Sequence, residues 1–276
     1  MDAETLPTQT TPKRPALRFH GGKWLLAPWL IKHFPEHRTY VEPFGGAASV
    51  LLRKERANNE IYNDLDNELV NFFQILRERG SELREALELT PFARAEFNQA
   101  CGSADDPLEQ ARRTAIRAWM GLHSNAIYRS TGFRSIGRSH GPSPATDWRN
   151  YPELLRAVIE RLRGVVLENR DALELIKSHD SPDTLFYVDP PYVKSTRSDG
   201  GRGYYHEMTD TDHEQLAERL HGLRGTVIIS GYPSKLYDRL YADWQRIDKQ
   251  HRAESAAARM ECLWISKQPP QRGLSL

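Results

Sequence analysis

The sequence predicts an α/β protein with a Rossmann-like, mainly parallel sheet and a mostly helical insert. Three observations predict this class. An apolar run, Leu185 to Val188, ends in an acid and two prolines. A strand-forming run near residue 40 leads into a glycine pair. Residues 81–164 have several helical patterns and no strong strand pattern. Buried parallel strands are apolar runs that alternate with helices, so a helical stretch between them indicates an insert.

Length and composition limit the class of protein. The chain has 276 residues, 39% hydrophobic and 27% charged, which fits one catalytic α/β domain with a smaller insert. Its net charge is +1, so a surface for nucleic acid must be local. The two cysteines, Cys101 and Cys262, have neither metal-ligand nor disulfide spacing, which favours a reducing cytosol. No cluster of metal ligands is evident in the sequence.

The N-terminal residues and the hydropathy predict the location of the protein. Residues 1–16 are polar and lack the apolar core of a signal peptide, so we expect a disordered lead-in. No apolar run approaches the roughly 20 residues that a membrane span needs. We therefore expect a cytoplasmic protein, in a bacterium or encoded by a phage within one.

Residues 185–192, with the sequence LFYVDPPY, carry the clearest chemistry. Proline cannot donate to a strand ladder, so Asp189 should lie at the carboxyl end of a central strand, where open α/β sheets bind ligands. The two prolines stiffen this corner. They direct the Asp189 carboxylate, the Pro190 carbonyl and the Tyr192 ring to one point. Two acceptors beside a flat ring suit a planar heterocycle with an amino group; the alternative is an ordinary turn with a capping acid.

The corner Asp189–Tyr192 resembles the catalytic motif of amino methyltransferases, which use S-adenosylmethionine to methylate exocyclic amines of nucleobases. With residues 18–66 it is similar to the Dam-like family of DNA adenine-N6 methyltransferases, the D12 class. The resemblance covers roughly residues 17–75 and 164–268 and implies a seven-stranded methyltransferase sheet. The catalytic residues that it implies are Asp189, Pro190, Pro191 and Tyr192.

A first cofactor segment lies at residues 18–23, before an expected helix at about residues 24–33. The family pattern aromatic-x-Gly-Gly-Lys falls on Phe19 and Lys23 and implies that both help to hold the cofactor. Arg18 occupies a basic position that reaches DNA in the family. Without the resemblance, this segment is a glycine turn before a helix.

A second cofactor segment, residues 39–52, is predicted to form a strand, a glycine turn and the start of a helix. Glycines let a ligand approach the backbone, and a helix N-terminus supplies free N–H groups. Such turns occur in many Rossmann-like proteins, but the residues around this one are similar to the methylase cofactor loop. The cofactor residues implied here are Glu42, Phe44, Gly45 and Gly46.

Three acids complete the predicted cofactor site. Asp64 ends a second strand about 20 residues after the glycine turn, where a carboxylate accepts hydrogen bonds from ribose hydroxyls, and the resemblance assigns it that role. Its neighbour Asp66 is better explained as the N-cap of a helix over 68–79. Asp171 follows a restored strand, either as N-cap of the helix 172–178 or, by resemblance, beside the amino group of the cofactor adenine. Asp189 is implied as a cofactor contact as well.

The insert carries a local excess of positive charge. No acid occurs between Gln110 and Thr146, whereas six arginines do. Arginines neutralise phosphates and bind guanine edges, and interleaved Asn and aromatic residues can stack or pair with bases. Ile116, Trp119 and Met120 are assigned to the core instead. The predicted DNA contacts are Asn125, Tyr128, Arg129, Arg134 and Arg138, from a loop that occupies the position of the family's target-recognition region.

The predicted helices of the insert are 81–89, 91–100, 107–121 and 151–163. After the catalytic corner, the polar loop 193–207 adds two cations for phosphates, Lys194 and Arg197, or is plain surface. A helix over 210–221, a strand over 225–231 and a final strand pair over 244–249 and 260–267 complete the seven strands. The predicted domains are a catalytic domain (17–78 and 164–276) and a DNA target-recognition insert (79–163).

The resemblance therefore implies a site-specific transfer of methyl from S-adenosylmethionine to N6 of an adenine flipped out of double-stranded DNA. Cytosine-N4 methylation is the nearest alternative, although that chemistry more often has serine in place of Asp189. A catalytically silent DNA-binding regulator of the same fold is the other. We expect a monomer, with or without a companion restriction nuclease, and no membrane partner.

Overall fold

The computed structural model describes residues 11–129, 131–135, 143–197, 204–252 and 258–266. Its strands are β1 (Thr39–Glu42), β2 (Asn59–Asn63), β3 (Val165–Glu168), β4 (Thr184–Val188), β5 (Thr226–Gly231), β6 (Gln245–Arg252) and β7 (Ala258–Ile265). Its helices are α1 (Ala27–Ile31), α2 (Asn67–Glu78), α3 (Gly80–Glu88), α4 (Arg94–Ala100), α5 (Pro107–Met120), α6 (Pro144–Leu162), α7 (Ala172–Ser178), the 3₁₀ helix η1 (Lys194–Thr196), α8 (Asp210–His221) and α9 (Lys235–Leu240).

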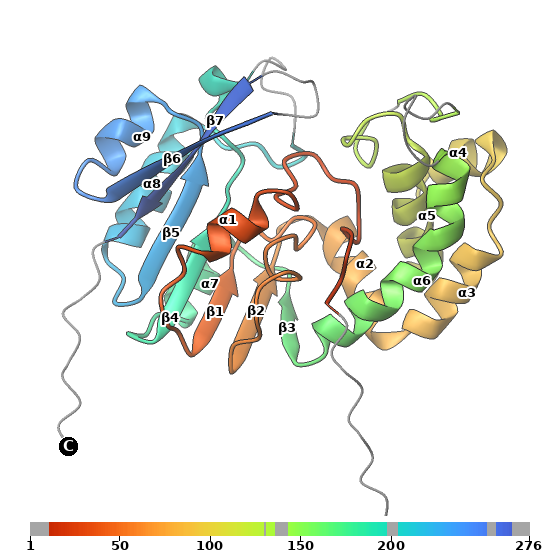
Figure 1. Cartoon of the computed structure of the whole chain (residues 1–276), viewed down its shortest axis with the longest axis horizontal. Helices are drawn as coiled ribbons and strands as arrows, with labels where there is room; N and C mark the ends of the chain where they lie inside the picture. Colours follow the sequence, from red (N-terminus) through yellow and green to blue (C-terminus); the bar gives the residue numbers. More distant parts are fainter. Residues whose placement is uncertain (1–10, 130, 136–142, 198–203, 253–257, 267–276) are drawn as a thin grey trace, which may run out of the picture. The chain divides into compact units, whose positions relative to one another are not determined.

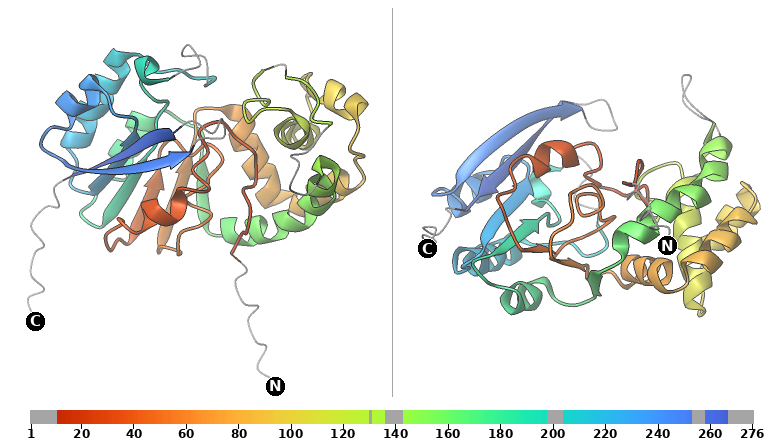
Figure 2. Two further views of the ribbon diagram at one scale, coloured as in Figure 1. Left: turned by 45° about the horizontal axis from the view of Figure 1, so that its top comes forward. Right: turned by 60° about the horizontal axis from the view of Figure 1, so that its bottom comes forward.

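The strands form one seven-stranded sheet in the order β3-β2-β1-β4-β5-β7-β6 (Figure 1). Strands β1 to β5 pair in parallel, and β7 runs antiparallel to both β5 and β6. The antiparallel pair, dark blue in Figure 2, ends the sheet at one edge. This order with an antiparallel β7 is typical of S-adenosylmethionine-dependent methyltransferases, so the predicted α/β class and seven-stranded sheet are confirmed.

The chain forms two compact units. The helical unit comprises Met1–Trp29, Gly46–Lys54 and Glu68–Gly164, and the sheet unit comprises Leu30–Gly45, Glu55–Asn67 and Val165–Leu276. The chain passes from one unit to the other between Gly45 and Gly46, inside the predicted cofactor loop. The predicted division into a catalytic domain and a recognition insert concerns function, and it stays a prediction.

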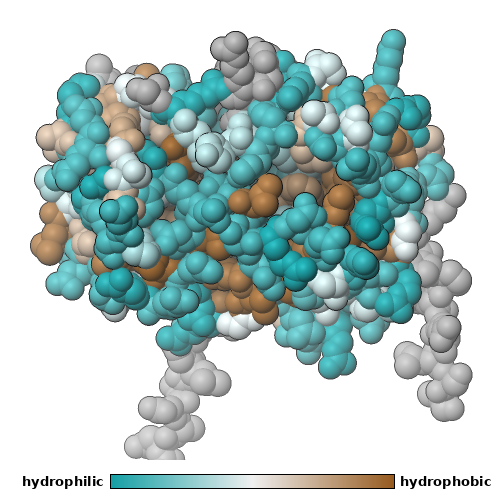
Figure 3. Space-filling model, turned by 180° about the vertical axis from the view of Figure 1, so that it is seen from behind, coloured by the Kyte–Doolittle hydropathy of each residue, from teal (hydrophilic) through white to brown (hydrophobic). Residues whose placement is uncertain are grey.

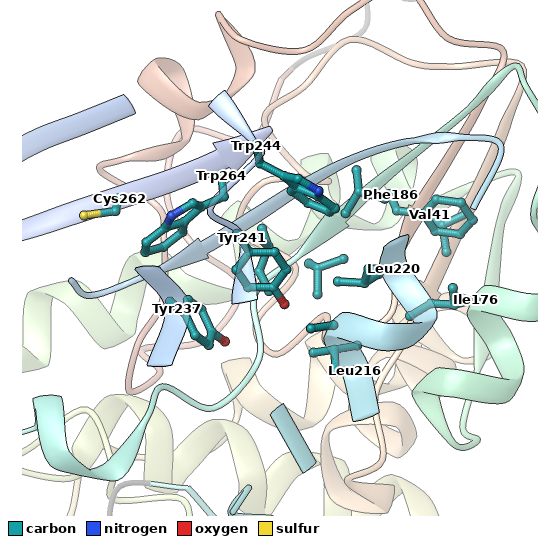
Figure 4. Close-up of a cluster of buried hydrophobic side chains, with 14 of the residues drawn as sticks. Val41, Ile176, Phe186, Leu216, Leu220, Tyr237, Tyr241, Trp244, Cys262 and Trp264 are labelled. Atoms are coloured by element: carbon teal, nitrogen blue, oxygen red, sulfur yellow. The ribbon is translucent and has the colours of Figure 1, made fainter. Parts of the chain in front are cut away.

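The core of the sheet unit lies between the sheet and three helices (Figure 4). Apolar residues of the parallel strands, such as Val41, Phe186 and Ile229, share a cluster with Leu175 of α7, Leu216 of α8 and side chains around α9. Alternate residues of a strand face opposite sides of a sheet, so one row packs against these helices. The other row includes Tyr40 and Tyr187, whose rings lie 5.7 and 5.8 Å from that of Phe34.

One buried histidine of this unit should make the free energy of unfolding depend on pH. His213 of α8 is fully buried, and its Nδ1 lies 3.1 Å from the Tyr237 hydroxyl of α9. Burial lowers the pKa of His213 from 6.5 to about 4. Between these values the unfolded chain binds a proton that the folded chain does not, so stability is complete above pH 6.5 and falls as the pH is lowered.

We expect the free energy of unfolding to drop by about 2 kcal/mol from pH 7 to pH 5 because of His213. Urea unfolding at both pH values measures this contribution. The variant His213→Gln should lose about that much of the pH dependence, whereas His206→Gln, at an exposed histidine, should keep all of it. Equal pH dependence in wild type and His213→Gln would contradict the assignment.

Two predicted helices need correction. The helix expected at 24–33 is a series of turns in which only Ala27–Ile31 is α-helical. The last helix of the insert begins at Pro144 rather than residue 151, because Ser143 caps it and Pro144 occupies its first turn. Its internal Pro152 does not end it. The expected helices at 81–89, 91–100 and 107–121 are confirmed as α3, α4 and α5, each within three residues at either end.

The N-terminal lead-in is ordered before residue 17. Ala16 is buried, and its carbonyl accepts hydrogen bonds from Trp119 Nε1 (3.2 Å) and the Tyr151 hydroxyl (2.8 Å). Arg14 pairs with Asp147 at 3.0 Å. The prediction of disorder through residue 16 is therefore wrong for residues 14–16, which composition alone could not show. Residues 1–10 lie outside the described residues.

The face of the molecule in Figure 3 is mostly hydrophilic, with hydrophobic residues in small groups among polar ones. In the described parts of the chain, no helix is long and apolar enough to cross a membrane.

Candidate active site

Asp189 follows β4 directly, in the middle of the sheet unit. Its Oδ1 accepts a hydrogen bond of 2.7 Å from Ser230 Oγ, near the end of the adjacent strand β5. The register explains this contact: Val188 is paired with Ile229, so the next residues of the two parallel strands are Asp189 and Ser230. Ser230 is fully buried, and its Oγ also lies 3.2 Å from the Tyr187 hydroxyl. The carboxylate is thereby held in one orientation.

Tyr192 ends the same corner and is almost completely buried, with 4% of its surface exposed. Its hydroxyl donates to Glu261 Oε1 of β7, and its ring meets that of Tyr232 edge-on at 4.7 Å. Burial, followed by the charges of Asp189 and Glu261, raises the pKa of Tyr192 well above its usual value. The phenol therefore stays protonated at neutral pH and acts as a donor. A base that stacks on this ring must first displace the groups that cover it.

The loop after β1 approaches β2 closely at Gly45. The Gly45 N–H donates to Asn63 O at 2.7 Å, and a Cβ on Gly45 would lie 2.2 Å from Tyr62 Cε2. Glu42 at the end of β1 is buried and accepts a hydrogen bond of 2.6 Å from Tyr40. Phe44 packs against the core cluster. The loop is therefore fixed by its own unit, at the carboxyl ends of parallel strands where ligands of this fold class bind.

The helix predicted after the glycine turn is absent. Residues 46–54 form successive turns, such as Leu52 N to Ala48 O at 2.9 Å. Gly46 and Ala48 have φ values of 50° and 54°, in the left-handed region that interrupts a right-handed helix. A positive φ is uncommon for alanine, so the residue type did not indicate this conformation.

The other two predicted acids, like Asp189, follow strands of the sheet unit. Asp64 follows β2, and its Oδ1 accepts the Asp66 N–H at 2.9 Å. Asp171 is exposed and caps α7 by accepting from the N–H groups of Leu173 and Glu174, so its predicted capping role is confirmed. Its contact with a cofactor stays a prediction, as does that of Asp64.

Asn63 joins the loops that carry these acids, and sequence analysis missed it. Its side chain is fully buried and donates to Pro43 O (2.9 Å) and Arg170 O (3.0 Å), while accepting from Arg170 N (3.0 Å). One amide thus ties together the loops after β1, β2 and β3. An asparagine at the end of a buried strand was the available signal.

The predicted cofactor residues of the helical unit also have defined positions. The Phe19 ring lies against Gly46, since a Cβ there would be 3.2 Å from Phe19 Cε1, and it meets the Tyr128 ring edge-on at 5.9 Å. Lys23 is buried and donates to Gly21 O at 3.0 Å. Arg18 donates to Gly121 O at 3.3 Å. The residues from the first motif, the glycine loop and the insert are therefore neighbours within this unit.

The residues of the loop 46–54 fit a polar ligand. Ser49 is buried, and its Oγ has no hydrogen-bond partner among the described residues. A buried hydroxyl without a partner is unfavourable, and a polar group of a bound cofactor would satisfy it. The described part of the chain contains no group of three or more His, Cys, Asp or Glu residues placed to hold a metal ion.

The arginines of the insert are largely paired within the protein. Arg112 and Arg113 both bind Glu109, at 2.7 and 2.8 Å, and Arg117 pairs with Glu68 of α2. The acid-free stretch of sequence therefore does not form a uniformly basic surface. Its charges meet acids from neighbouring segments, which a count along the chain cannot anticipate. The assignment of Ile116, Trp119 and Met120 to the core is confirmed.

The predicted DNA contacts differ in their exposure and in whether their side chains already pair with other groups of the protein. Arg129 and Lys194 are exposed, and Asn125 is half-buried. Arg134 pairs with Asp147 at 3.5 Å. Arg197 is nearly buried against Glu207, and its guanidinium lies 5.2 Å from the centre of the Tyr204 ring. Arg138 lies outside the described residues.

Comparison with known proteins supports the same chemistry. Residues 19–255 match the family described as D12 class N6 adenine-specific DNA methyltransferase. The chain is 25% identical over 251 residues to the type II methyltransferase M1.LlaDCHI of Lactococcus lactis subsp. cremoris, covering 84% of this chain and 85% of that protein.

Two further relatives are DNA adenine methylases. That of Vibrio cholerae is 24% identical over 250 residues, covering 83% of this chain and 85% of the relative. That of Salmonella typhi is 24% identical over 256 residues, covering 86% of each. The methyltransferase sheet, the Asp-Pro-Pro-Tyr corner at the end of β4 and a match over most of the chain agree: the chain belongs to the D12 class of N6 adenine-specific DNA methyltransferases.

Proposed function

We propose that this chain methylates N6 of an adenine that has been flipped out of duplex DNA at a specific sequence, with Asp189 and Pro190 holding the amine. The observation that supports this most is the position of Asp189 directly after β4, with its Oδ1 bound to Ser230 at 2.7 Å. The family uses S-adenosylmethionine as methyl donor. Because a paired base cannot reach such a corner, flipping is required, at a cost of a few kcal/mol.

In this mechanism the protein activates a poor nucleophile. The N6 lone pair of adenine is delocalised into the ring. Hydrogen bonds from the two N6 protons to the Asp189 carboxylate and the Pro190 carbonyl favour a pyramidal nitrogen with its lone pair directed at the methyl group. The donor supplies an electrophilic sulfonium methyl. The new N–C bond forms as the C–S bond breaks, and the amine then releases one proton toward Asp189. Ser230 and Pro191 keep the acceptors in place, and positioning of this kind contributes roughly 7–11 kcal/mol in favourable cases.

The cofactor contacts that we propose in the sheet unit lie at carboxyl ends of strands: Asp64 for the ribose hydroxyls, Asp171 for the adenine amino group, and Glu42, Phe44 and Gly45 in the loop after β1. Asn63 supports them by joining the three loops. In the helical unit, Phe19, Lys23 and Gly46 are proposed from the family motif. The contact between the Phe19 ring and Gly46 supports their acting together.

The proposed DNA contacts are Arg18, Asn125, Tyr128, Arg129, Arg134, Arg138, Lys194 and Arg197. Their environments predict unequal contributions. Arg129 is exposed, whereas Arg134 pairs with Asp147, which also binds Arg14. Each phosphate that a cation neutralises adds about 0.9 to the slope of log binding constant against log salt concentration. Removing an exposed cation that contacts a phosphate therefore reduces that slope by about 0.9.

We therefore expect Arg129→Ala to weaken DNA binding and to reduce the salt slope by about one unit. Arg134→Ala should mainly lower the melting temperature, because it removes one partner of the buried Asp147. Fluorescence anisotropy over a series of salt concentrations measures the slope, and thermal unfolding measures the stability. A reduced slope in Arg134→Ala with an unchanged melting temperature would contradict this ranking.

The proposed reaction is tested with purified full-length protein, plasmid DNA from a methylase-free host and labelled S-adenosylmethionine. After digestion, mass spectrometry of the nucleosides should show N6-methyladenine. N4-methylcytosine in its place would favour the cytosine alternative. A folded protein that binds the cofactor but modifies no DNA would favour the regulator and would contradict the proposal.

A further inference from the structure

We propose that Glu261 is a positioning residue for methyl transfer, which fixes the ring orientation of Tyr192 through a hydrogen bond to its hydroxyl. Tyr232 supports the same ring from its side. The inference rests on the proposed catalytic role of Asp189–Tyr192, and it adds a buried acid of β7 to the residues on which that corner depends.

The sheet brings these residues together by its register. In the antiparallel pair of β5 and β7, Gly231 is paired with Cys262, so Tyr232 and Glu261 are the next residues in register. Glu261 is only 1% exposed, and its direct neighbours in β7, Met260 and Cys262, are apolar. Its Oε1 accepts the hydrogen bond from Tyr192. The acid thus reaches the catalytic corner from a strand more than 60 residues later in the chain.

Burial of a carboxylate is unfavourable unless hydrogen bonds or charges compensate for it. An apolar residue would occupy a buried position of β7 at lower cost. What the carboxylate provides is a strong, fixed acceptor for a phenol that remains protonated, and hydrogen bonds with an ionised acceptor are the stronger ones. A carboxylate at position 261 therefore supplies the Tyr192 hydroxyl with an acceptor that an apolar residue would not.

The ring of Tyr192 is restrained at two points. Its hydroxyl is bound to Glu261, and its ring meets the Tyr232 ring at 4.7 Å with an interplanar angle of 79°. Tyr232 is itself packed under the guanidinium of Arg259, 5.3 Å from the ring centre. Rotation of the Tyr192 side chain about its Cα–Cβ bond would carry the hydroxyl away from Glu261 and the ring away from Tyr232. A side chain held in this way fixes the plane on which a base can stack once the groups that cover the ring are displaced, and it keeps the adjacent Pro190–Pro191 backbone in place.

The experiment compares Glu261→Ala, Glu261→Gln, Tyr192→Phe and the double variant Tyr192→Phe/Glu261→Ala in the full-length protein. The substrate is a duplex oligonucleotide that carries the site methylated by the wild type. We expect Glu261→Ala to lower kcat about tenfold to a hundredfold, as misplacement of reacting groups does, with KM for S-adenosylmethionine within about threefold of wild type. Tyr192→Phe, which removes only the hydroxyl, should lower kcat similarly.

The double variant is the decisive comparison. If Glu261 acts through the Tyr192 hydroxyl, the double variant should be within about twofold of the weaker single variant, since the two changes remove one interaction. Glu261→Gln keeps an acceptor oxygen of the same shape and should restore most of the kcat that Glu261→Ala loses. It also keeps the comparison possible if Glu261→Ala fails to fold.

Glu60→Gln is the matched control, because Glu60 is a buried carboxylate of the same sheet, 3% exposed, that binds Ala57 N and pairs with Arg56. Its strand β2 is separated from β4 by β1. This variant should leave kcat unchanged. Unchanged kcat in the Glu261 and Tyr192 variants, multiplied effects in the double variant, or an equal loss in Glu60→Gln would each overturn the inference while leaving the proposed function intact. A folded wild type without activity on any DNA would overturn both.

Discussion

Replacing Asp189 by asparagine is expected to lower the rate of methyl transfer by about 10²–10⁴-fold, the range for groups that accept a proton or orient it in the transition state. Asparagine has the same shape, but its amide presents no negative charge and offers a donor where the N6 amine needs an acceptor. Ser230 can still bind the amide oxygen, so the corner should keep its geometry. Single-turnover kinetics with saturating cofactor measure the loss.

Asp183→Asn is the matched control, because it makes the same change just before the opposite end of β4. Its rate should equal that of the wild type. The affinity of Asp189→Asn for S-adenosylmethionine should fall by no more than about tenfold, the value of roughly one hydrogen bond. A rate within fivefold of wild type in Asp189→Asn would remove Asp189 from the proposed mechanism.

Gly45→Ala is expected to have the second large effect. The added Cβ would lie 2.2 and 2.4 Å from two ring carbons of Tyr62 and 3.0 Å from Asn63 O. Tyr62 is fully buried and cannot move aside, so the loop after β1 must shift. We expect a loss of about 1–3 kcal/mol in the free energy of unfolding, and a fall of more than about tenfold in cofactor affinity, because displacement by about an ångström disrupts binding geometry.

Gly164→Ala is the control for Gly45→Ala, because it introduces backbone strain without displacing a neighbouring side chain. Gly164 has a φ of 80°, but no atom lies within 4 Å of a Cβ built there. The variant should lose about 1 kcal/mol or slightly more of stability through strain and keep its cofactor affinity. Calorimetric titration of S-adenosylmethionine and denaturant unfolding distinguish the two variants. Equal cofactor affinities in both would contradict the assignment of the loop after β1 to the cofactor site.

The sheet was predictable because its strands carry local signals. Apolar runs ending in turn residues identified β4 and β5, and the final pair β6 and β7 was placed within a few residues at its described ends. The termination of β4 at Asp189 followed from the missing N–H groups of two prolines. Each of these signals lies within a few consecutive residues, and the structure confirms the strands predicted from them.

Features that depend on the fold were missed. Because Ala48 has a left-handed φ, turns stand where a helix was expected after the glycine turn. Alanine rarely adopts such a φ, so its presence did not predict this conformation. The arginines of α5 appeared to be an unbalanced group of charges, yet Glu68 of α2 and Glu96 of α4 supply partners. Pairing across elements is not visible in a window of sequence.

Ser230, Tyr232 and Glu261 could have been suspected but not assigned. Each is a polar or aromatic residue at the end of, or within, an apolar strand. Their importance depends on strand order: β5 lies next to β4, and β7 lies next to β5. Only that order places Ser230 beside Asp189 and Glu261 beside Tyr192.

The proposed function depends on methylation of adenine N6 by the corner Asp189–Tyr192 at a defined DNA sequence. Single-molecule methylation sequencing of DNA from a methylase-free host tests it most directly, with hosts expressing the wild type, Asp189→Asn and Asp183→Asn. We expect N6-methyladenine in one short motif for the wild type and Asp183→Asn, and none for Asp189→Asn. N6-methyladenine in the same motif from folded Asp189→Asn at the wild-type level, or no modified adenine from the folded wild type, would contradict it.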